Sequence, residues 1–212
     1  MTTKVLNLYA GIGGNRKLWE DVEVTAVEWD EEKAEVYQDH FPEDEVVVTD
    51  AHEYLKNHYT EYDFIWASPP CPTHSRTNTM SVLADNERSG NHEREFEYPD
   101  MKLYQEIILL RNFADCDYVV ENVISYYEPL IDPQTLQRHY FWSNAQIPKA
   151  DFEKDDISRG SVSKWENQIG LSVQNLPADK RRKAIRNCVK PELGKHVFEA
   201  VSKNRQSKLF EE

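Results

Sequence analysis

A thiol, Cys71, follows two prolines, Pro69 and Pro70, at the end of the apolar run Phe64–Ala67. Such a run is typical of a buried strand, and open α/β sheets bind ligands and carry out chemistry beyond the carboxyl ends of their strands. Prolines restrict the backbone before the cysteine and, through Pro72, after it, so the loop should be stiff. The pattern predicts a free thiol held in a fixed position at a ligand-binding edge of a sheet.

A glycine turn ends the first apolar run of the chain, where Tyr9 precedes Gly11, Gly13 and Gly14. Glycines let a ligand approach the backbone, and a following helix would offer free N–H groups at its N-terminus. Arg16 stands where the dinucleotide-binding fingerprint has its third glycine, so that fingerprint is incomplete. The turn by itself indicates only close approach of a ligand.

Polar and aromatic groups end the next two expected strands. Glu28 is placed to accept hydrogen bonds from ribose hydroxyls, as the acidic residue of nucleotide-binding α/β folds does. Trp29 can stack on an adenine, and Asp50 can accept a hydrogen bond from the amine of that ring. Each of the three also fits a solvated residue at a strand end. Together with the glycine turn they favour a cofactor that contains adenosine.

A second group of residues suits the chemistry of a heterocyclic ring. Glu121 ends the expected strand Tyr118–Glu121, and a carboxyl there can give a hydrogen bond or a proton to a ring nitrogen. Arg138 precedes an aromatic run and offers a planar guanidinium for a carbonyl oxygen. A surface carboxylate and a surface ion pair are the alternatives for these two residues.

The pattern of the first half predicts βαβ units and a doubly wound, mostly parallel α/β sheet. The expected strands are Lys4–Tyr9, Val22–Trp29, Val46–Thr49, Asp63–Ala67 and Tyr118–Glu121. The expected helices are Glu31–His40, Ala51–Tyr59, Met101–Ala114 and Pro191–Lys203. The polar stretch Thr73–Tyr98 has no core-forming run and follows the thiol directly, so we interpret it as a lid over the site.

Composition narrows the class of protein. A chain of 212 residues fits a single domain, 1–212, and no apolar stretch or leader indicates a membrane or a secretory route. We therefore expect a cytoplasmic protein without a membrane partner.

Charge is distributed unevenly along the chain. Residues 1–128 carry 10 Lys and Arg against 27 Asp and Glu, whereas residues 129–212 carry 15 against 11. The basic cluster 180–183 with Arg186 can meet a phosphate backbone or form a solvated helix face.

These residues resemble the DNA (cytosine-5) methyltransferases, and the resemblance covers nearly the whole chain. The motifs that carry it are, in family order, Leu8–Gly14, Glu28–Asp30, Asp50, Pro70–Cys71, Glu121–Val123, Gln134–Arg138 and Asn187–Val189. The resemblance implies a Rossmann-like fold that uses S-adenosylmethionine and releases S-adenosylhomocysteine. It implies methyl transfer to carbon 5 of a cytosine in DNA.

The family mechanism gives each matching residue a role. Cys71 would add to C6 of cytosine, Glu121 would hold and protonate N3, and Arg138 would hold the ring carbonyl. The residues that match the family's cofactor pocket are Tyr9, Gly11, Gly13, Glu28, Trp29, Asp50, Asn187 and Val189. The target base in duplex DNA would be flipped out of the stack.

Several positions depart from the family pattern. Asn7 stands where the family has an aspartate, and Leu136 replaces the first arginine of its arginine motif. Arg138 and Asn187 are only 49 positions apart, so residues 143–183 form a reduced segment where a target-recognition domain would normally lie. We therefore expect short or loose sequence specificity, or a protein partner that supplies it. Small orphan enzymes of this kind are expected in phages and prophages.

Three alternatives remain open on the sequence. The same chemistry can act on RNA or on a free nucleotide. A non-catalytic, nucleic-acid-binding or regulatory relative would keep the fold and lose the nucleophile. The presence of Cys71 argues against this alternative. An amino-methyltransferase resembles the chain through Ser68–Pro70, but its next residue stacks on the base, which a cysteine does not do.

Overall fold

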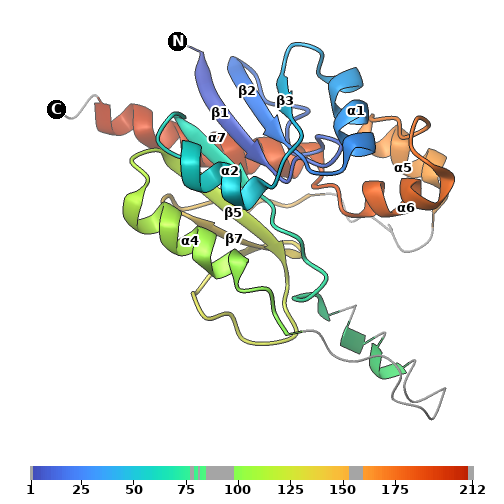
Figure 1. Cartoon of the computed structure of the whole chain (residues 1–212). Helices are drawn as coiled ribbons and strands as arrows, with labels where there is room; N and C mark the ends of the chain where they lie inside the picture. Colours follow the sequence, from blue (N-terminus) through green and yellow to red (C-terminus); the bar gives the residue numbers. More distant parts are fainter. Residues whose placement is uncertain (1, 77–78, 81, 85–97, 153–159, 210–212) are drawn as a thin grey trace.

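The computed structural model describes residues 2–76, 79–80, 82–84, 98–152 and 160–209, which form a sheet with helices on both faces (Figure 1). The strands are β1 (Thr3–Leu8), β2 (Val22–Val27), β3 (Glu45–Val47), β4 (Phe64–Ala67), β5 (Asp117–Val123), β6 (Gln134–Leu136) and β7 (His139–Ser143). The helices are α1 (Glu31–His40), α2 (Ala51–His58), α4 (Lys102–Phe113), α5 (Val162–Ile169), α6 (Ala178–Arg186) and α7 (Pro191–Leu209).

The sheet has the order β3-β2-β1-β4-β5-β7-β6, and β7 runs antiparallel to both of its neighbours. The first five strands of this order are parallel. The direction of winding reverses between β1 and β4, and ligands of open α/β sheets bind at such a switch point. The order confirms the doubly wound, mostly parallel sheet. It brings the glycine turn after β1 beside the Pro–Cys loop after β4.

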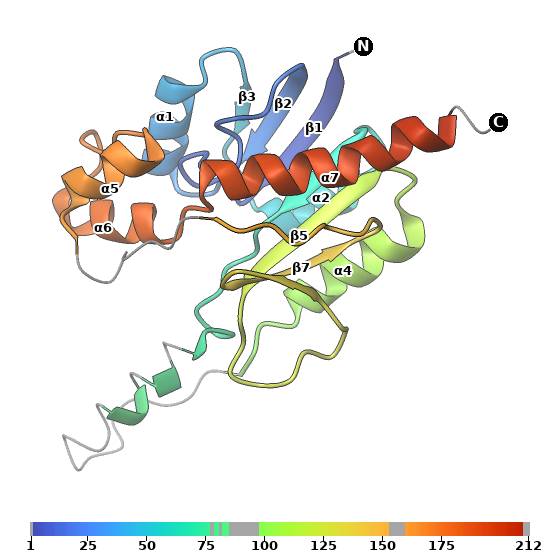
Figure 2. The ribbon, with the colours of Figure 1, turned by 180° about the vertical axis from the view of Figure 1, so that it is seen from behind.

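Two apolar layers cover the sheet. The layer on one face joins α2 and α4 to β1, β4 and β5, with Leu55, Ile65 and Ile107 among its fully buried side chains. The layer on the other face joins α7 to the same strands, with Trp66 and Val197 at its centre. Figure 2 shows α7 lying across that second face. Each central strand is buried on both sides, which explains its continuous apolar run.

Local signals explain the helices that follow the strands. Asp30 and Asp50 are the N-caps of α1 and α2, and each carboxylate accepts a hydrogen bond from an amide in the first turn. The observed bounds of α1 match the prediction, and those of α2 and α4 differ from it by one residue at one or both ends. Helix α7 extends beyond the predicted end, Lys203, to Leu209.

The chain between residues 129 and 186 contains regular structure that the sequence pattern does not indicate. Strands β6 and β7 form a hairpin, and the turn between them needs Gln137 in the left-handed conformation (φ 54°). Helix α5 begins at the Ser161 N-cap and ends at Gly170 (φ 62°). Helices this short carry little periodicity, and tertiary packing stabilises them.

Trp165, Val173 and Leu176 bury this helical region against Ile12 and α1. Much of the predicted reduced segment, 143–183, therefore contributes to a small core. The predicted lid, Thr73–Tyr98, falls largely outside the described residues. Among the residues that are described, no helix has the length and apolar composition needed to cross a membrane.

Candidate active site

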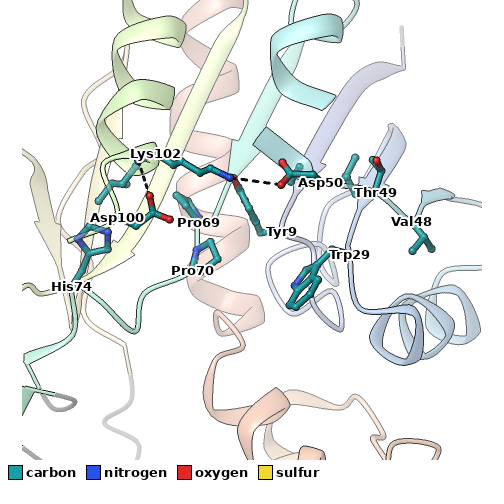
Figure 3. Close-up of a pocket in the computed structure, with 13 residues that line it drawn as sticks. Tyr9, Trp29, Val48, Thr49, Asp50, Pro69, Pro70, His74, Asp100 and Lys102 are labelled. Carbon is teal, nitrogen blue, oxygen red and sulfur yellow. Dashed lines mark hydrogen bonds and ion pairs between the residues drawn. The ribbon is translucent and has the colours of Figure 1, made fainter. Parts of the chain in front are cut away.

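A cavity of about 460 Å³ opens at the carboxyl ends of β1, β2 and β4 (Figure 3). Three residues predicted to bind the cofactor line it, namely Tyr9, Trp29 and Asp50. The opposite wall includes Pro70 and His74, which belong to the loop that carries the thiol. The cavity therefore joins the predicted cofactor residues to the predicted catalytic loop.

The polar end of the cavity is built around Asp50. Its carboxylate caps α2 and lies 3.7 Å from Lys102 Nζ, as Figure 3 shows. The hydrogen bond from the Glu53 amide lowers the pKa of Asp50, with a further contribution from Lys102. Asp50 is therefore ionised at neutral pH and can accept a hydrogen bond from a ligand amine. Trp29 is 71% exposed, so its indole presents an open face to a stacked ring.

Glu28 accepts hydrogen bonds that hold the glycine turn in place. Its Oε2 accepts a hydrogen bond from Gly11 N at 2.9 Å, and its Oε1 accepts one from Asp30 N at 3.0 Å. Glu28 itself is buried. Gly11 has φ +57°, and a Cβ built on it would meet nothing within 4 Å. This open space lets a ligand reach the turn, and a carboxylate keeps acceptor capacity after two hydrogen bonds.

The remaining predicted cofactor residues lie on the far side of the turn. Gly13 has φ +83° and packs against the ring of Phe41, so it shapes the turn. A Cβ on Gly14 would lie 2.4 Å from Val189 O, which shows how closely the segment after α6 approaches. Asn187 is the exposed C-cap of α6. Gly13, Asn187 and Val189 do not line the cavity itself.

Tyr9 is anchored by a buried carboxylate. Its hydroxyl donates to Glu106 Oε1, and His52 Nδ1 contacts the same oxygen at 3.0 Å. Burial and the nearby Glu106 charge raise the pKa of Tyr9, so its hydroxyl keeps its proton and remains a donor. The hydrogen bond to Glu106 raises the pKa of His52. This network ties the glycine turn to α2 and α4, and the sequence gives no sign of it.

The Cys71 loop is fixed by backbone and side-chain hydrogen bonds. Cys71 O accepts hydrogen bonds from His74 N at 3.0 Å and Ser75 N at 2.9 Å. Asn122, in the Glu-Asn-Val motif of β5, donates from Nδ2 to Pro69 O at 3.0 Å. These hydrogen bonds hold the loop in place and attach it directly to the strand that carries Glu121.

Opposing charges act on the thiol. Cys71 is half-buried, and burial together with the Glu121 charge raises its pKa, while Lys183 on α6 lowers it. The Glu121 charge therefore acts on the Cys71 thiol. Arg138 is exposed in the turn between β6 and β7, so its side chain faces solvent near this end of the sheet.

The sequence also matches a known family at these positions. A model of C-5 cytosine-specific DNA methylases matches residues 3–123, more than half of the chain, including β1, the Pro–Cys loop and the Glu-Asn-Val motif. The chain belongs to this family. No curated protein matches it.

Two solved structures illustrate the likeness. The chain is similar to a mutant of Spodoptera frugiperda DNMT2, with 25% identity and a TM-score of 0.39, over 57% of this chain and 36% of that one. It is similar to the Entamoeba histolytica methyltransferase EhMeth, with 14% identity and a TM-score of 0.42, over 77% of this chain and 62% of that one. The chain thus spans less than two thirds of the length of either protein.

Sequence reasoning misses three residues of this candidate site. His139 Nδ1 lies 2.6 Å from Glu121 Oε1, His74 lines the cavity, and Lys183 acts on the thiol. Burial lowers the pKa of His74, whose Nδ1 lies 2.5 Å from Tyr127 Oη. The order of strands and the packing of α6 bring these residues to the site. The only feature of the sequence that marks His139 is its position at the start of the aromatic run His139–Trp142.

Some residues of the basic cluster 180–183 with Arg186 make contacts within the protein, and others are exposed. Lys180 pairs with Asp30 and Glu32, and Arg182 lies over the ring of Trp165 at 5.0 Å. These contacts agree with a structural role for that part of α6. Lys183 and Arg186 are exposed at the end of the helix.

Proposed function

We propose that this protein transfers a methyl group from S-adenosylmethionine to carbon 5 of cytosine in DNA. The observation that carries the proposal is the hydrogen bond from Asn122 to Pro69 O, which joins the Cys71 loop to the neighbouring strand that carries Glu121, beside a cavity lined by the predicted cofactor residues. Membership of the C-5 cytosine-specific DNA methylase family supports the same reaction. The covalent step and the residue roles below are parts of the proposal.

The lining of the cavity suits the chemistry of the cofactor. Trp29 offers an exposed face for the adenine, and the ionised Asp50 offers an acceptor for its amine. The open space at Gly11 allows close approach to the backbone, with Glu28 beneath it. When bound, S-adenosylmethionine supplies an electrophilic methyl group. The residues of the cavity would orient that group toward the Cys71 loop.

The protein would activate cytosine by a temporary covalent bond. Carbon 5 is a weak nucleophile, so the Cys71 thiolate first adds to C6, and C5 gains the electron density needed to attack a methyl group. Glu121 would give a proton to N3 during the addition, and Arg138 would stabilise the ring carbonyl. Loss of the C5 proton and departure of the thiolate would then release the methylated base.

The charges around the thiol link the addition of the thiolate to C6 with the transfer of a proton from Glu121 to N3. An ionised Glu121 opposes thiolate formation, because its negative charge raises the pKa of Cys71. A proton on Glu121 removes that opposition. The state that can protonate N3 is therefore the state in which the nucleophile forms more readily. Lys183 favours the thiolate in either state.

The substrate we infer is duplex DNA with a flipped target base, because a paired base cannot reach a half-buried thiol. Lys183 and Arg186 lie on the helix whose charge reaches Cys71, so they can contact phosphates flanking the target. Residues in the 143–183 segment pack into a small core with Ile12 and α1. Little of the described part of that segment is left to read base edges, which supports short specificity or a protein partner.

The test is nucleoside analysis after incubation with labelled S-adenosylmethionine and duplex DNA, with single-stranded DNA and RNA in parallel. We expect 5-methyldeoxycytidine from duplex DNA. Cys71→Ala should abolish methyl transfer and retain cofactor binding. Cys116→Ala, a matched change of a buried thiol that directly precedes the amino end of β5, should retain both.

The products distinguish the alternatives. Methylated cytidine from RNA alone would move the substrate to RNA. Methylation of an exocyclic amine would indicate amino-methyltransferase chemistry. Full activity of Cys71→Ala would contradict the covalent step.

A further inference from the structure

The carboxylate of Glu121 is paired with a histidine, His139, that lies just beyond the Gln134–Arg138 motif. His139 Nδ1 lies 2.6 Å from Glu121 Oε1, which is short for a nitrogen–oxygen hydrogen bond. The side chains of His139 and Glu121 are 17% and 8% exposed. A carboxylate this deeply buried is costly unless it is paired and hydrogen-bonded.

The register of β5 and β7 places the pair. Glu121 lies opposite Phe141, and Val123 lies opposite His139, so all four side chains share one face of the sheet. Glu121 and His139 are therefore diagonal neighbours, a relation within reach of long side chains. The hydrogen bond from Ile124 N to Arg138 O at 3.4 Å continues the pairing to the end of the hairpin. Rigid backbone on both strands holds the two groups together.

The pairing leaves one carboxylate oxygen for a substrate. The hydrogen bond engages Oε1, and among the described residues no hydrogen bond engages Oε2. The hydrogen bond from Asn122 Nδ2 to Pro69 O at 3.0 Å joins the strand that carries Glu121 to the loop that carries Cys71, and the Glu121 charge acts on that thiol. Because the imidazole engages one oxygen, the other stays available to a ring that meets the thiol.

We propose that His139 is a positioning residue for Glu121, and this inference rests on the function proposed above. Its Nδ1–H holds Oε1 so that Oε2 faces N3 of the target cytosine. It also stabilises the carboxylate that forms when Glu121 gives up its proton. The hydrogen bond strengthens at that moment, because an ionised acceptor binds an N–H group more strongly than a neutral one.

The electron pair of the Cys71 thiolate forms the bond to C6, and the C5–C6 π electrons shift toward C4 and N3. N3 takes the proton from Glu121 Oε2, which leaves a neutral adduct and a Glu121 carboxylate held by His139. C5 of the adduct then takes the methyl group, and solvent water accepts the C5 proton. The electrons of that C–H bond re-form the C5–C6 double bond as the thiolate leaves, and N3 returns its proton to Glu121. His139 gives up no proton and acts through Glu121.

Two substitutions separate positioning from simple packing. His139→Asn places an amide N–H near the position of Nδ1, whereas His139→Leu fills similar space without a donor. Tyr140→Phe is the matched control, because Tyr140 is the next residue on β7 and points to the opposite face. All variants are compared by kcat and KM on duplex DNA, and by adduct formation with DNA that contains 5-fluorocytosine.

We expect His139→Leu to lower kcat by roughly 100-fold, within the range that general acid catalysis contributes, with KM changed little. Adduct formation should slow in parallel, because the proton is needed at the addition step. His139→Asn should recover roughly 10-fold of the lost rate, and Tyr140→Phe should behave as the wild type. Cofactor affinity should be equal in all four proteins, which shows that the fold is retained.

Other outcomes overturn the inference. A kcat for His139→Leu within about twofold of the wild type removes any role for the pair. Equal losses in His139→Asn and His139→Leu, with cofactor affinity retained, would refute positioning through a donor. If the wild type forms neither adduct nor 5-methylcytosine on any nucleic acid, the proposed function itself fails, and the inference fails with it.

Discussion

Replacing Tyr9 by phenylalanine should destabilise the protein more than the same change at an ordinary tyrosine. The Tyr9 hydroxyl donates to Glu106 Oε1, which also contacts His52 Nδ1 at 3.0 Å. Glu106 is only 1% exposed and belongs to α4, whereas Tyr9 follows β1 and His52 lies on α2. Loss of the hydroxyl would therefore remove one hydrogen bond from a buried carboxylate whose partners lie on two other elements.

The magnitude follows from the charge of the acceptor. Hydrogen bonds to charged groups contribute about 1.5–3 kcal/mol, against about 0.5–1.5 kcal/mol for neutral pairs. His52 still partners Oε1 in the variant, so the carboxylate is not left wholly unpaired. We expect the free energy of unfolding to fall by about 2 kcal/mol. In a chain of this size that loss corresponds to a decrease in Tm of roughly 4–8 °C.

Urea unfolding at pH 7, followed by tryptophan fluorescence without added cofactor, measures the loss. Tyr54→Phe is the control, because the Tyr54 hydroxyl lies 3.2 Å from the neutral hydroxyl of Tyr62. It should lose about 1 kcal/mol or less. A double-mutant cycle with Glu106→Gln should give a coupling energy above about 0.5 kcal/mol. Equal losses in the two tyrosine variants, or no coupling to Glu106, would refute the reasoning.

Three further predictions concern pH, the thiol and the cofactor turn. The folded pKa of His52 is raised, so its stabilisation should be complete below about pH 6.5 and lost as pH rises through the folded value. The difference in unfolding free energy between wild type and His52→Asn should therefore shrink from pH 6 to 9, and a constant difference would argue against a charged pair. Lys183→Gln should raise the pKa of Cys71 and slow its alkylation by iodoacetamide several-fold at pH 8, since Lys183 favours the thiolate; an unchanged rate would show that the charge does not reach the thiol. Gly14→Ala should lower the free energy of unfolding by about 1–3 kcal/mol, because the new Cβ would overlap Val189 O. It should also weaken cofactor binding, measured by calorimetry. Unaltered stability and affinity would show that the segment after α6 moves without cost.

Local sequence determined the elements that carry strong local signals. The apolar run Phe64–Ala67 forms a strand buried on both faces, and Asp30 and Asp50 begin α1 and α2 as capping residues do. The motif residues stand at strand ends because turns and caps are encoded within a few positions. The sequence therefore predicts the doubly wound sheet and the placement of the Cys71 loop at its edge.

Tertiary structure alone decided which groups act on one another. Glu106 meets Tyr9 across 97 positions and His52 across 54, and no short-range pattern encodes a contact over such distances. His139 meets Glu121 only because β7 pairs antiparallel with β5 in one register, and a shift of one residue would turn its ring to the other face. The sequence determined which chemical groups are present at the sheet edge. Packing between distant elements decided their partners, and through those partners their charge and orientation.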